Sequence, residues 1–392
     1  MPPVIVIGAG IVGVCAAAWL QRAGRQVLLI DQGDPGMGAS FGNGGIFSAS
    51  SIVPVAMPGV IGKVPGWLLD AEGPLTIRWS YLPRLAPWLA RFVAASTSER
   101  VEAQARALRA LLEGSLANYA PLVKDAGAED LVRHQGMLYL YAAEASWRGD
   151  ARAMELRRRN GVAIEEITGP ALAEREPDLG PGFTRARLIP GNGHTTNPLR
   201  LVQKLAQNVI ARGGRIVQER VLGFEHNGAA VSSVKTNLTA HPASAVVLAA
   251  GAWSKSLATE LGDRVPLDTE RGYHTVVKNP EKTVRTPSLF VDGSFGLIPM
   301  ETGLRLVGTI ELAGLDAPPN WARSRVLLEQ GKRILPGLPV IGPSSRYANA
   351  FYAFGHGHIG MCGASTTGKL ISALVAGEKL ELNIKPYSAQ RF

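Results

Sequence analysis

The chain contains little cysteine: only Cys15 and Cys362 occur among its 392 residues. Two thiols cannot build the disulfide framework of a small secreted protein, and they cannot hold a metal cluster. We therefore expect a reducing compartment and no metal site. The first residues already have the pattern of a buried strand, which leaves no room for a secretory signal peptide and favours the cytoplasm.

The sequence also lacks a hydrophobic run long enough to cross a bilayer. Residues 46–92 are apolar, but prolines and Lys63 interrupt every candidate span. We therefore expect no transmembrane helix. A group of aromatic residues follows in the same region, namely Trp79, Tyr81, Trp88 and Phe92. These residues predict a lid packed over a pocket, with a membrane-touching surface as the alternative.

Acidic residues are outnumbered, with 32 Asp and Glu against 41 Lys and Arg, which gives a formal charge of +9. The arginines are spread over helical faces, as in the run Arg157-Arg158-Arg159, so a solvated surface is the simpler interpretation. The alternative is attraction to an acidic partner or to anionic lipid at the inner face of a membrane. Interleaved basic and aromatic residues are lacking, which argues against nucleic acid as a partner.

What the N-terminus does contain is a buried strand followed by closely spaced glycines. The apolar residues 4–7 lead directly into Gly8, Gly10 and Gly13, a G-x-G-x-x-G spacing. The first glycine permits a tight turn, the second a close approach of a pyrophosphate, and the third the packing of helix on strand. We expect that helix over residues 11–23, with its free N–H groups and positive dipole end facing the phosphates.

A second apolar strand, residues 26–30, ends on Asp31. An acid about twenty residues beyond the glycines is where the hydroxyl pair of a ribose is held, and it disfavours a 2′-phosphate. Strand, glycines, helix, second strand and acid in this order predict a dinucleotide site. The length of 392 residues suggests a second domain as well.

Three further glycine-containing segments favour contacts with the same cofactor. Residues 38–45 place Ser40 and Asn43 among four glycines. Residues 245–251 form an apolar strand that ends in small residues. Residues 351–360 lead into a helix expected over residues 363–375, and a glycine-rich turn there would place N–H donors near developing negative charge.

Elsewhere the strict alternation of strand and helix is lost. Residues 97–120 and 145–160 have the pattern of charged surface helices, and residues 136–141 have the pattern of a strand. Another helix is expected from residue 197 to about residue 212. This change of pattern indicates a second domain inserted in the first.

Together these motifs resemble one family. The segments GAGIVG, ASFGNGG, VVLAAGAWS, LPVIGP and YAFGHGHIG, with Asp31, are similar to the D-amino-acid oxidase class of FAD-dependent oxidoreductases, closest to its D-amino-acid dehydrogenase-like branch. The resemblance implies an α/β fold, with an FAD-binding Rossmann-like (three-layer) domain and an inserted α+β substrate domain built on a mixed sheet. The implied FAD-binding domain is discontinuous and comprises residues 1–80, 191–262 and 339–392. The substrate domain would comprise residues 81–190 and 263–338.

The resemblance also implies the cofactor contacts. The glycines of the first turn would lie under the pyrophosphate of FAD, Asp31 on the adenosine ribose, and the backbone of Val221 on the adenine. The turn 357–361 would face the pyrimidine edge of the flavin, and Cys362 lies in the wrong place for a covalent link, so FAD should be non-covalent. The full set of implied contacts is Gly8, Gly10, Ile11, Val12, Gly13, Asp31, Gln32, Ser40, Asn43, Gly44, Gly45, Val221, Ala250, Gly251, Trp253, Gly357, His358, Ile359, Gly360 and Met361.

For chemistry, the resemblance implies oxidation of the C–N bond of a small-molecule amine or D-amino acid, with hydride transfer to flavin N5 and oxygen or a quinone as electron acceptor. Because the flavin performs the transfer, no catalytic residue is assigned. The substrate carboxylate needs a cation, and Arg271 and Arg305 are the candidates. Tyr273 and His274 alternate along one strand, so at most one of them faces the pocket directly. His356 flanks the flavin turn and is the remaining candidate.

One feature departs from the family pattern. A Gly-x-Arg-Pro motif, whose arginine commonly grips the substrate carboxylate, normally precedes the LPVIGP segment. Here residues 334–338 run directly into residues 339–343 without it. The departure leaves a second interpretation open: a flavin-binding protein with lost or altered catalysis, or an enzyme that oxidises a hydroxy acid. A nicotinamide-only dehydrogenase is disfavoured by the later cofactor motifs.

Overall fold

The computed structural model describes residues 1–59, the even-numbered positions from 62 to 70, residues 72–228 and 230–335, the strands 340–343 and 351–354, and Lys379. The strands of these residues form five sheets. A parallel sheet contains the N-terminal strand, and a larger mixed sheet combines strands from both halves of the chain. The two sheets position the residues of interest, so they are described first.

The N-terminal pattern forms the expected parallel sheet. Its strand order is β10-β2-β1-β14. The strands are β1 (Val4–Ile7), β2 (Val27–Asp31), β10 (Arg215–Gln218) and β14 (Ala245–Leu248). All three pairings are parallel, and every residue of β1 is buried. Burial on both faces explains why β1 is an unbroken apolar run rather than an alternating one.

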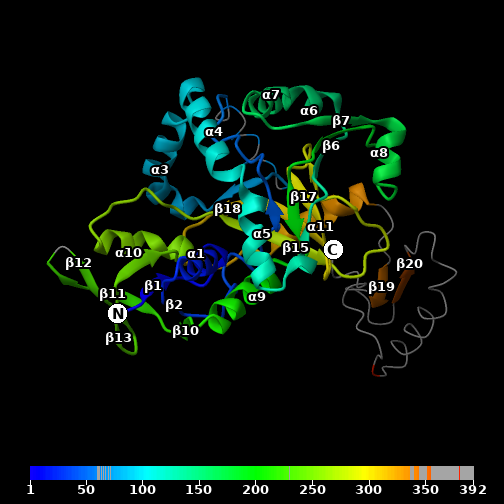
Figure 1. Cartoon of the computed structure of the whole chain (residues 1–392). Helices are drawn as coiled ribbons and strands as arrows, with labels where there is room; N and C mark the ends of the chain where they lie inside the picture. Colours follow the sequence, from blue (N-terminus) through cyan, green and yellow to red (C-terminus); the bar gives the residue numbers. More distant parts are fainter. Residues whose placement is uncertain are drawn as a thin grey trace.

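Both faces of this sheet are covered, which confirms the three layers. One face carries the helices α1 (Ile11–Arg22), α5 (Ser115–Asp125) and α9 (Pro198–Ala211), which share a core with Val6 and Leu29. The other face carries a meander of β11 (Val221–Asn227), β12 (Ala230–Thr236) and β13 (Ala240–Pro242). There Ile5 and Ile7 pack against Phe224 and Val234. Figure 1 shows these layers at the lower left, beside the N-terminus.

The larger sheet is mixed, as expected for the inserted domain. Its order is β15-β18-β17-β16-β6-β8-β7, with β4 paired to β18. The strands are β4 (Leu75–Ile77), β6 (Met137–Tyr141), β7 (Glu165–Thr168), β8 (Arg185–Ile189), β15 (Arg271–Val277), β16 (Ser288–Phe290), β17 (Phe295–Met300) and β18 (Gly303–Leu312). The pairs β16–β6 and β18–β4 are parallel and the others antiparallel. The sequence places β4 in the FAD-binding domain, which is expected to extend to residue 80. In the structure, β4 instead pairs with β18 of the large mixed sheet.

The strands β15 and β18 have two differently covered faces. On one face, α11 (Ala322–Ile334) packs Leu327 and Ile334 against Leu304 and Leu306. The other face meets the loop of residues 38–45, because Arg305 of β18 donates to the carbonyls of Phe41 and Asn43. The short strand β3 (Ile46–Phe47) follows this loop in the chain. A loop from the first fifty residues therefore lies against the second face of β18.

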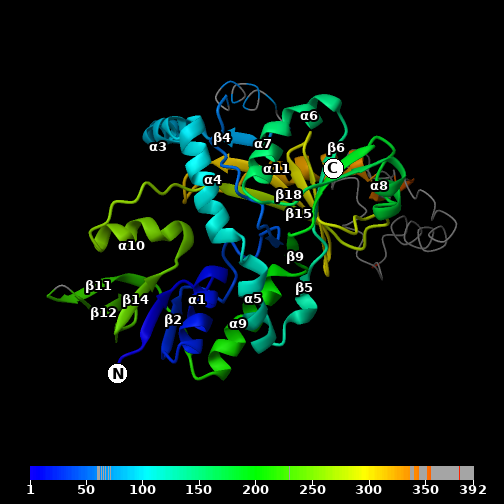
Figure 2. The ribbon, with the colours of Figure 1, turned by 45° about the horizontal axis from the view of Figure 1, so that its top comes forward.

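Helices cover the outer side of the large sheet (Figure 1). They are α3 (Leu82–Ala94), α4 (Ser98–Leu112), α6 (Glu144–Gly149), α7 (Ala151–Arg159) and α8 (Gly169–Arg175). Figure 2 shows α4 and α5 running from this side down toward α1 and α9. The helix expected over residues 97–120 is divided between α4 and α5 at Gly114, a residue that disfavours helix interiors. The helix expected over residues 145–160 is divided at Asp150, whose carboxylate accepts a hydrogen bond from Tyr141.

Two small sheets complete the described strands. Strand β9 (Gly193–Thr195) lies between β3 and β5 (Val132–Arg133), and it thereby ties the segment after the loop 38–45 to the rest of the chain. The strands β19 (Val340–Pro343) and β20 (Phe351–Phe354) pair with each other in antiparallel fashion.

Candidate functional site

The three glycines of the first turn have different neighbours. Gly8 has a φ of +107°, and a Cβ there would lie 2.4 Å from the carbonyl oxygen of Ala249. A Cβ on Gly13 would lie 1.8 Å from the carbonyl oxygen of Gly8. At Gly10 the nearest atom would be the hydroxyl of Ser40, at 3.4 Å. Gly8 and Gly13 are therefore required by the fold itself, whereas the space at Gly10 is left for another molecule, as a pyrophosphate requires.

The N-terminus of α1 offers free N–H groups beside this space. Gly10 caps the helix without a side-chain hydrogen bond, and the first turn contains no acidic residue. The hydroxyl of Ser40 accepts from the N–H of Ile11 at 3.0 Å. Val12, in the same turn, is 69% exposed. A helix N-terminus whose first turn has no acid, and whose cap residue makes no side-chain hydrogen bond, fits the phosphates of a dinucleotide.

Asp31 ends β2 with its carboxylate fixed against the glycine turn. Its Oδ2 accepts from the N–H of Ala9 at 2.7 Å and its Oδ1 from the N–H of Gly33 at 2.9 Å. Each carboxylate oxygen retains acceptor capacity, so the group can still hold ribose hydroxyls. Gln32 follows, and its carbonyl accepts from Gln218 at 3.4 Å.

The loop 38–45 is fixed at both ends. At one end Ser40 binds the helix N-terminus, and near the other end Asn43 Oδ1 accepts from the N–H of Gly45 at 2.7 Å. Gly45 has a φ of +68°, which favours glycine. A Cβ on Gly44 would touch Val307 at 3.4 Å, so this part of the loop lies close against β18. We name residues 38–45 the cofactor loop.

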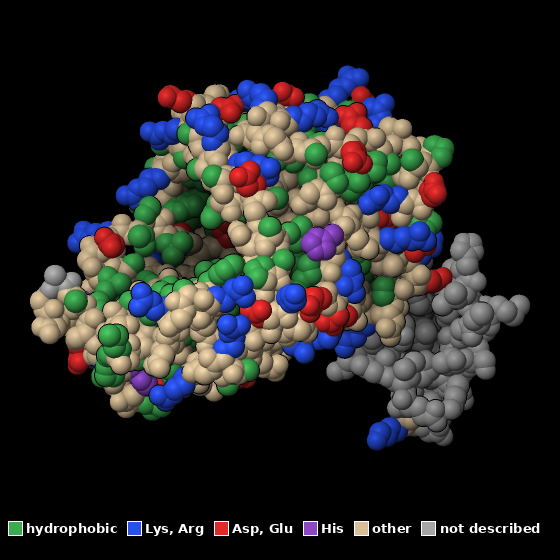
Figure 3. All heavy atoms as spheres, in the orientation of Figure 1, with side chains coloured by type: hydrophobic (Ala, Val, Ile, Leu, Met, Phe, Trp, Pro, Cys, Tyr) green, Lys and Arg blue, Asp and Glu red, His purple; other side chains and the backbone are tan. Residues whose placement is uncertain are grey.

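The remaining described cofactor candidates lie at the end of β14 and the start of β11. Strand β14 leads through Ala250 into a short 3-10 helix (Gly251–Trp253) and then α10 (Ser254–Glu260). Trp253 is 49% exposed, and nothing lies within 4 Å of a Cβ built on Gly251. Val221 is half-buried at the first position of β11. Figure 3 shows a hollow lined by hydrophobic side chains between the regions of α3 and α10.

Several expected residues lie outside the described part of the chain. They are the substrate candidate His356 and the flavin-turn residues Gly357, His358, Ile359, Gly360 and Met361. Their assignments stay predictions from the sequence. The same holds for Cys362 and the absence of a covalent link.

The substrate candidates on β15 divide between the two faces of the sheet. Arg271 and Tyr273 both contact Glu311, a buried residue of β18. The Arg271 guanidinium lies 3.5 Å from the Glu311 carboxylate, and the Tyr273 hydroxyl donates to the same carboxylate. Burial and this hydrogen bond raise the pKa of Tyr273. Tyr273 is moreover part of the core beneath α11. The positive charge of Arg271 is compensated on that side by the Glu311 carboxylate.

His274 and Arg305 lie on the opposite face, against the cofactor loop. Nη1 of Arg305 donates to the carbonyls of Phe41 at 3.1 Å and Asn43 at 2.7 Å. The ring of His274 packs edge-on against Phe41 and touches Gly42, where a Cβ would lie 3.0 Å from Nδ1. Burial, and secondarily the charge of Arg305, lower the pKa of His274. This side of the sheet therefore brings a neutral imidazole and a guanidinium to the loop that resembles a cofactor contact.

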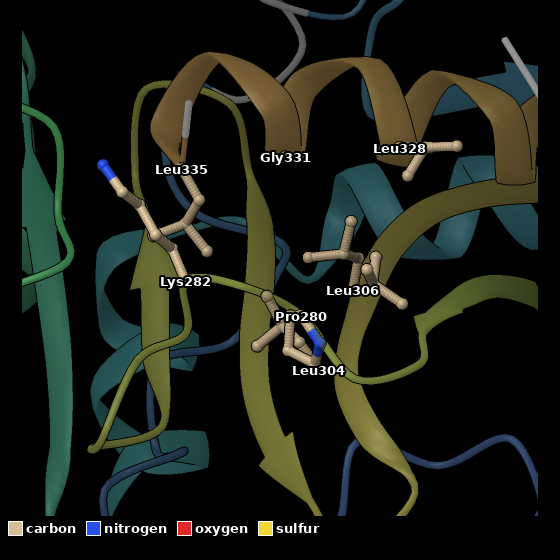
Figure 4. Close-up of a pocket in the computed structure, with 8 residues that line it drawn as sticks. Pro280, Lys282, Leu304, Leu306, Leu328, Gly331 and Leu335 are labelled. Atoms are coloured by element: carbon tan, nitrogen blue, oxygen red, sulfur yellow. The ribbon is translucent and has the colours of Figure 1, made fainter. Parts of the chain in front are cut away.

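A small cavity lies on the α11 side. Figure 4 shows its lining by Val277, Pro280, Lys282, Leu304, Leu306, Leu328, Gly331 and Leu335. Its volume of about 10 Å³ is barely enough for one water. The amine of Lys282 points away from the other side chains (Figure 4). We interpret the cavity as a packing gap, because it can hold neither substrate nor cofactor.

Within the described residues, no three His, Cys, Asp or Glu side chains gather as metal ligands. Burial raises the pKa of the Cys15 thiol to about 11, so the thiol is protonated at neutral pH. No helix in the described part of the chain is long and apolar enough to span a bilayer. Lys and Arg side chains are spread across the face in Figure 3, with acidic side chains among them.

Two buried residues of this region escape the sequence patterns. Glu311 carries no local signal, because its partner Arg271 lies forty residues away. His194 on β9 is 1% exposed, and burial lowers its pKa to about 4. Its position beside β3 follows only from the pairing of His194 with Ile46. A histidine between glycine and threonine in a short strand does not by itself predict that the side chain is buried.

Comparisons with known proteins agree with these features. Residues 3–374 match the family of FAD dependent oxidoreductases, DAO. The chain is 37% identical to a D-amino-acid oxidase of Bradyrhizobium diazoefficiens, over 415 aligned positions that cover 99% of this chain and 98% of the relative. It is 28% identical to a D-amino acid dehydrogenase of the same organism, over 420 positions with coverage of 99% and 98%. Both alignments are longer than the 392 residues of the chain, so each relative has residues without a counterpart here.

Solved structures show the same fold. A glycine oxidase from Geobacillus kaustophilus superposes with a TM-score of 0.59 at 20% identity, covering 100% of this chain and 99% of that one. An L-proline dehydrogenase from P. horikoshii superposes with a TM-score of 0.62 at 19% identity, covering 100% and 97%. The parallel sheet, the glycine turn, the acid of β2 and the mixed second sheet thus agree with the family match. The chain belongs to the DAO family of FAD-dependent oxidoreductases.

Proposed function

We propose that this enzyme oxidises the C–N bond of an amine or a D-amino acid. When bound, FAD would supply the hydride acceptor, at flavin N5, for oxidation of the substrate C–N bond to an imine, which water would hydrolyse. The observation that carries the proposal is the 37% identity to a D-amino-acid oxidase over 99% of the chain. The meeting of His274 and Arg305 with the cofactor loop supports it.

The residues of this chain then have distinct tasks. The turn of Gly10 and the N-terminus of α1 bind phosphate, and Asp31 binds the adenosine ribose. The cofactor loop follows the rest of FAD, which is held without a covalent link. His274 and Arg305 are the favoured substrate-side groups, because Arg271 is paired with Glu311. His356 keeps its place among the candidates.

Anaerobic reduction of the bound flavin tests the proposal. The purified yellow protein is mixed, without oxygen, with D-amino acids, the matching L-amino acids, glycine and simple amines. We expect loss of the oxidised flavin absorbance with at least one D-amino acid or amine. The carbonyl product (an oxo acid from an amino acid, an aldehyde or ketone from a primary amine) and ammonia should appear in equal amounts. Reduction by none of these compounds, with dithionite still reducing the flavin, would contradict the proposal.

The second candidate is altered catalysis on a different donor. It is favoured by the absent Gly-x-Arg-Pro motif and by aligned relatives that are longer than this chain. The same anaerobic assay with α-hydroxy acids separates the two functions. Flavin reduction by a hydroxy acid alone would favour this candidate, and reduction by no donor would favour a flavin-binding protein without turnover.

We further propose a quinone as the electron acceptor, with the protein in the cytoplasm near the inner membrane face. The excess of basic residues and the 69% exposure of Trp79 support this assignment. Reoxidation of the reduced flavin is measured with oxygen and with a soluble quinone, and binding is measured by sedimentation with anionic vesicles. Fast reoxidation by oxygen and no vesicle binding would instead indicate a cytoplasmic oxidase.

A further inference from the structure

Arg305 is a buried cation that has no counter-ion among the residues the structure describes. It lies in β18, which pairs on both sides with β15 and β17, and it is only 6% exposed. Within the described residues, no Asp or Glu forms an ion pair with it. A charge this deep is costly unless it is paired, and breaking such a pairing is costly in turn. The position therefore calls for an anion.

Among the described residues, the hydrogen-bond partners of Arg305 occupy only one edge of the guanidinium. Both of its bonds start from Nη1 and end on the carbonyls of Phe41 and Asn43. Its buried Nε has no partner, and Nη2 donates to none of the described residues. The two carbonyls of the cofactor loop thus orient the fork, while two parallel donors remain. This is the geometry in which arginine binds a carboxylate in bidentate fashion.

Arg157 provides an internal contrast. It is similarly buried, at 8% exposure, and it also has no ion pair with a described acid. However, its Nε donates to the Ser50 carbonyl, its Nη1 to Met154 and its Nη2 to the Tyr139 hydroxyl. Its charge also lies over the Tyr139 ring at 5.0 Å. Each of the three nitrogens of Arg157 thus has a partner, whereas in Arg305 only Nη1 has one among the described residues.

The surroundings of Arg305 favour a small ligand. The loop beside it contains Gly42 and Gly44, which bring backbone rather than side chains to this face. His274 stands next to it as a neutral ring that can hydrogen-bond a ligand without adding charge. The other cation, Arg271, is compensated by Glu311 on the α11 side. Of the two arginines on β15 and β18, Arg305 is the one whose charge no described carboxylate compensates.

We propose that Nε and Nη2 of Arg305 bind the carboxylate of the substrate, and that the cofactor loop holds the guanidinium in place for it. The assignment rests on the proposed function, because it takes the substrate to be an amino acid. An anionic group of the cofactor is the other source of the same chemistry. Binding of a carboxylate that cannot be oxidised distinguishes the two sources.

Benzoate is titrated into the oxidised holoprotein and the flavin absorption is followed, with benzyl alcohol as the uncharged control. We expect benzoate to perturb the spectrum and benzyl alcohol not to. In Arg305→Lys, which keeps the charge but loses the fork, the benzoate dissociation constant should rise about ten- to hundredfold, as expected for hydrogen bonds to a charged group. In Arg157→Lys, the matched control, it should stay within about twofold of wild type.

Equal benzoate binding in Arg305→Lys and wild type would overturn the proposal. So would a wild-type protein whose flavin spectrum does not respond to any small carboxylate. If Arg305→Met then still lost FAD affinity, as measured by flavin fluorescence, the charge would serve the cofactor instead. Benzoate binding does not require turnover, so the result stands apart from the outcome of the anaerobic substrate assay.

Discussion

The parallel sheet and the large mixed sheet carry their charged residues in different ways. In the parallel sheet, Asp31 stands at the end of a strand, and its carboxylate contacts Ala9, 22 residues away. In the large sheet, Arg305 and Glu311 lie within a strand, buried among apolar neighbours. Arg305 donates to a carbonyl 264 residues earlier in the chain. The first kind of site is assembled by local turns, and the second only by strands and loops that are distant in the sequence.

The glycines of the first turn also differ from one another in what they do. A side chain at Gly13 collides with the turn itself, whereas a Cβ at Gly10 meets only the Ser40 hydroxyl, on the side proposed for the cofactor. The same local motif therefore contains residues that maintain the fold and a residue that admits a ligand. Substitutions at these two positions should separate stability from cofactor binding.

The largest effect is expected for Gly13→Ala. The added Cβ would lie 1.8 Å from the Gly8 carbonyl, so the helix must move away from the strand, at a cost of about 3 kcal/mol or more in the free energy of unfolding. Gly10→Ala meets only a flexible hydroxyl at 3.4 Å and should leave the apoprotein stable. Gly10→Val should fold but lose FAD. Urea unfolding of the apoproteins and the FAD content after purification measure both effects. Stoichiometric FAD in Gly10→Val would contradict the assigned position of the pyrophosphate.

A smaller effect is expected from pH at His194, on the buried strand β9. The ring donates to the carbonyl of Pro299 on β17, and its Nδ1 has no partner among the described residues. The folded pKa is about 4, against a reference value of 6.5 for the unfolded chain. Above pH 6.5 the group is neutral in both states. Below it the unfolded chain binds a proton that the folded chain does not, so stability falls, by about 3 kcal/mol at pH 4.

Urea unfolding at pH 7.5, 6 and 5 measures this dependence. In His194→Gln the loss of stability toward pH 5 should be smaller than in wild type by up to about 2 kcal/mol, which corresponds to the interval from pH 6.5 to 5. His134→Gln, at an exposed position, is the control. The same pH slope in His194→Gln and wild type would mean that another group is responsible.

The two sheets also differ in how much of them the sequence predicts. The glycine turn, the strand ending on Asp31 and the helix α9 all follow from patterns within about twenty residues, and the structure confirms them. The pairing of Arg271 with Glu311 cannot be predicted from such local patterns. A bulge between Gly272 and Tyr273 shifts the register against β18, which places Arg271 opposite Glu311. A shift of this kind depends on the pairing strand, so alternation along β15 alone cannot reveal it.

Asp31→Ala tests the locally assembled site, and we expect its effect on FAD affinity to be intermediate among the predicted effects. The substitution removes the acceptor that we propose for the ribose and should cost about 1.5–3 kcal/mol of FAD binding, a ten- to hundredfold loss of affinity. It also removes the bonds to Ala9 and Gly33, so some apoprotein stability should be lost with it. Asp31→Asn, which retains one acceptor oxygen, should lie between wild type and Asp31→Ala. Titration of apoprotein with FAD, followed by fluorescence, gives the affinities. An unchanged affinity in Asp31→Ala would move the ribose contact elsewhere.

The smallest effect is expected for Arg271→Lys, and it bears most directly on the contrast between the two arginines. The sequence offers Arg271 and Arg305 as candidates for the substrate carboxylate, with Arg271 the better placed of the two. In the structure, Arg271 is paired with Glu311 and bonds the Leu315 carbonyl at 3.5 Å, on the rim of the α11 side. A lysine can still reach Glu311, and a partly exposed ion pair contributes about 0–1 kcal/mol. Arg271→Lys should therefore change the unfolding free energy by less than about 1 kcal/mol and leave flavin reduction by a D-amino acid within about twofold of wild type.

Arg305→Lys should slow that reduction at low substrate concentration, because the bidentate fork is lost while the charge remains. A neutral amine should be oxidised equally by both variants. If Arg271→Lys slowed reduction by the amino acid but not by the neutral amine, then Glu311 would have to release Arg271 when substrate binds, and the two faces of the sheet would not be independent.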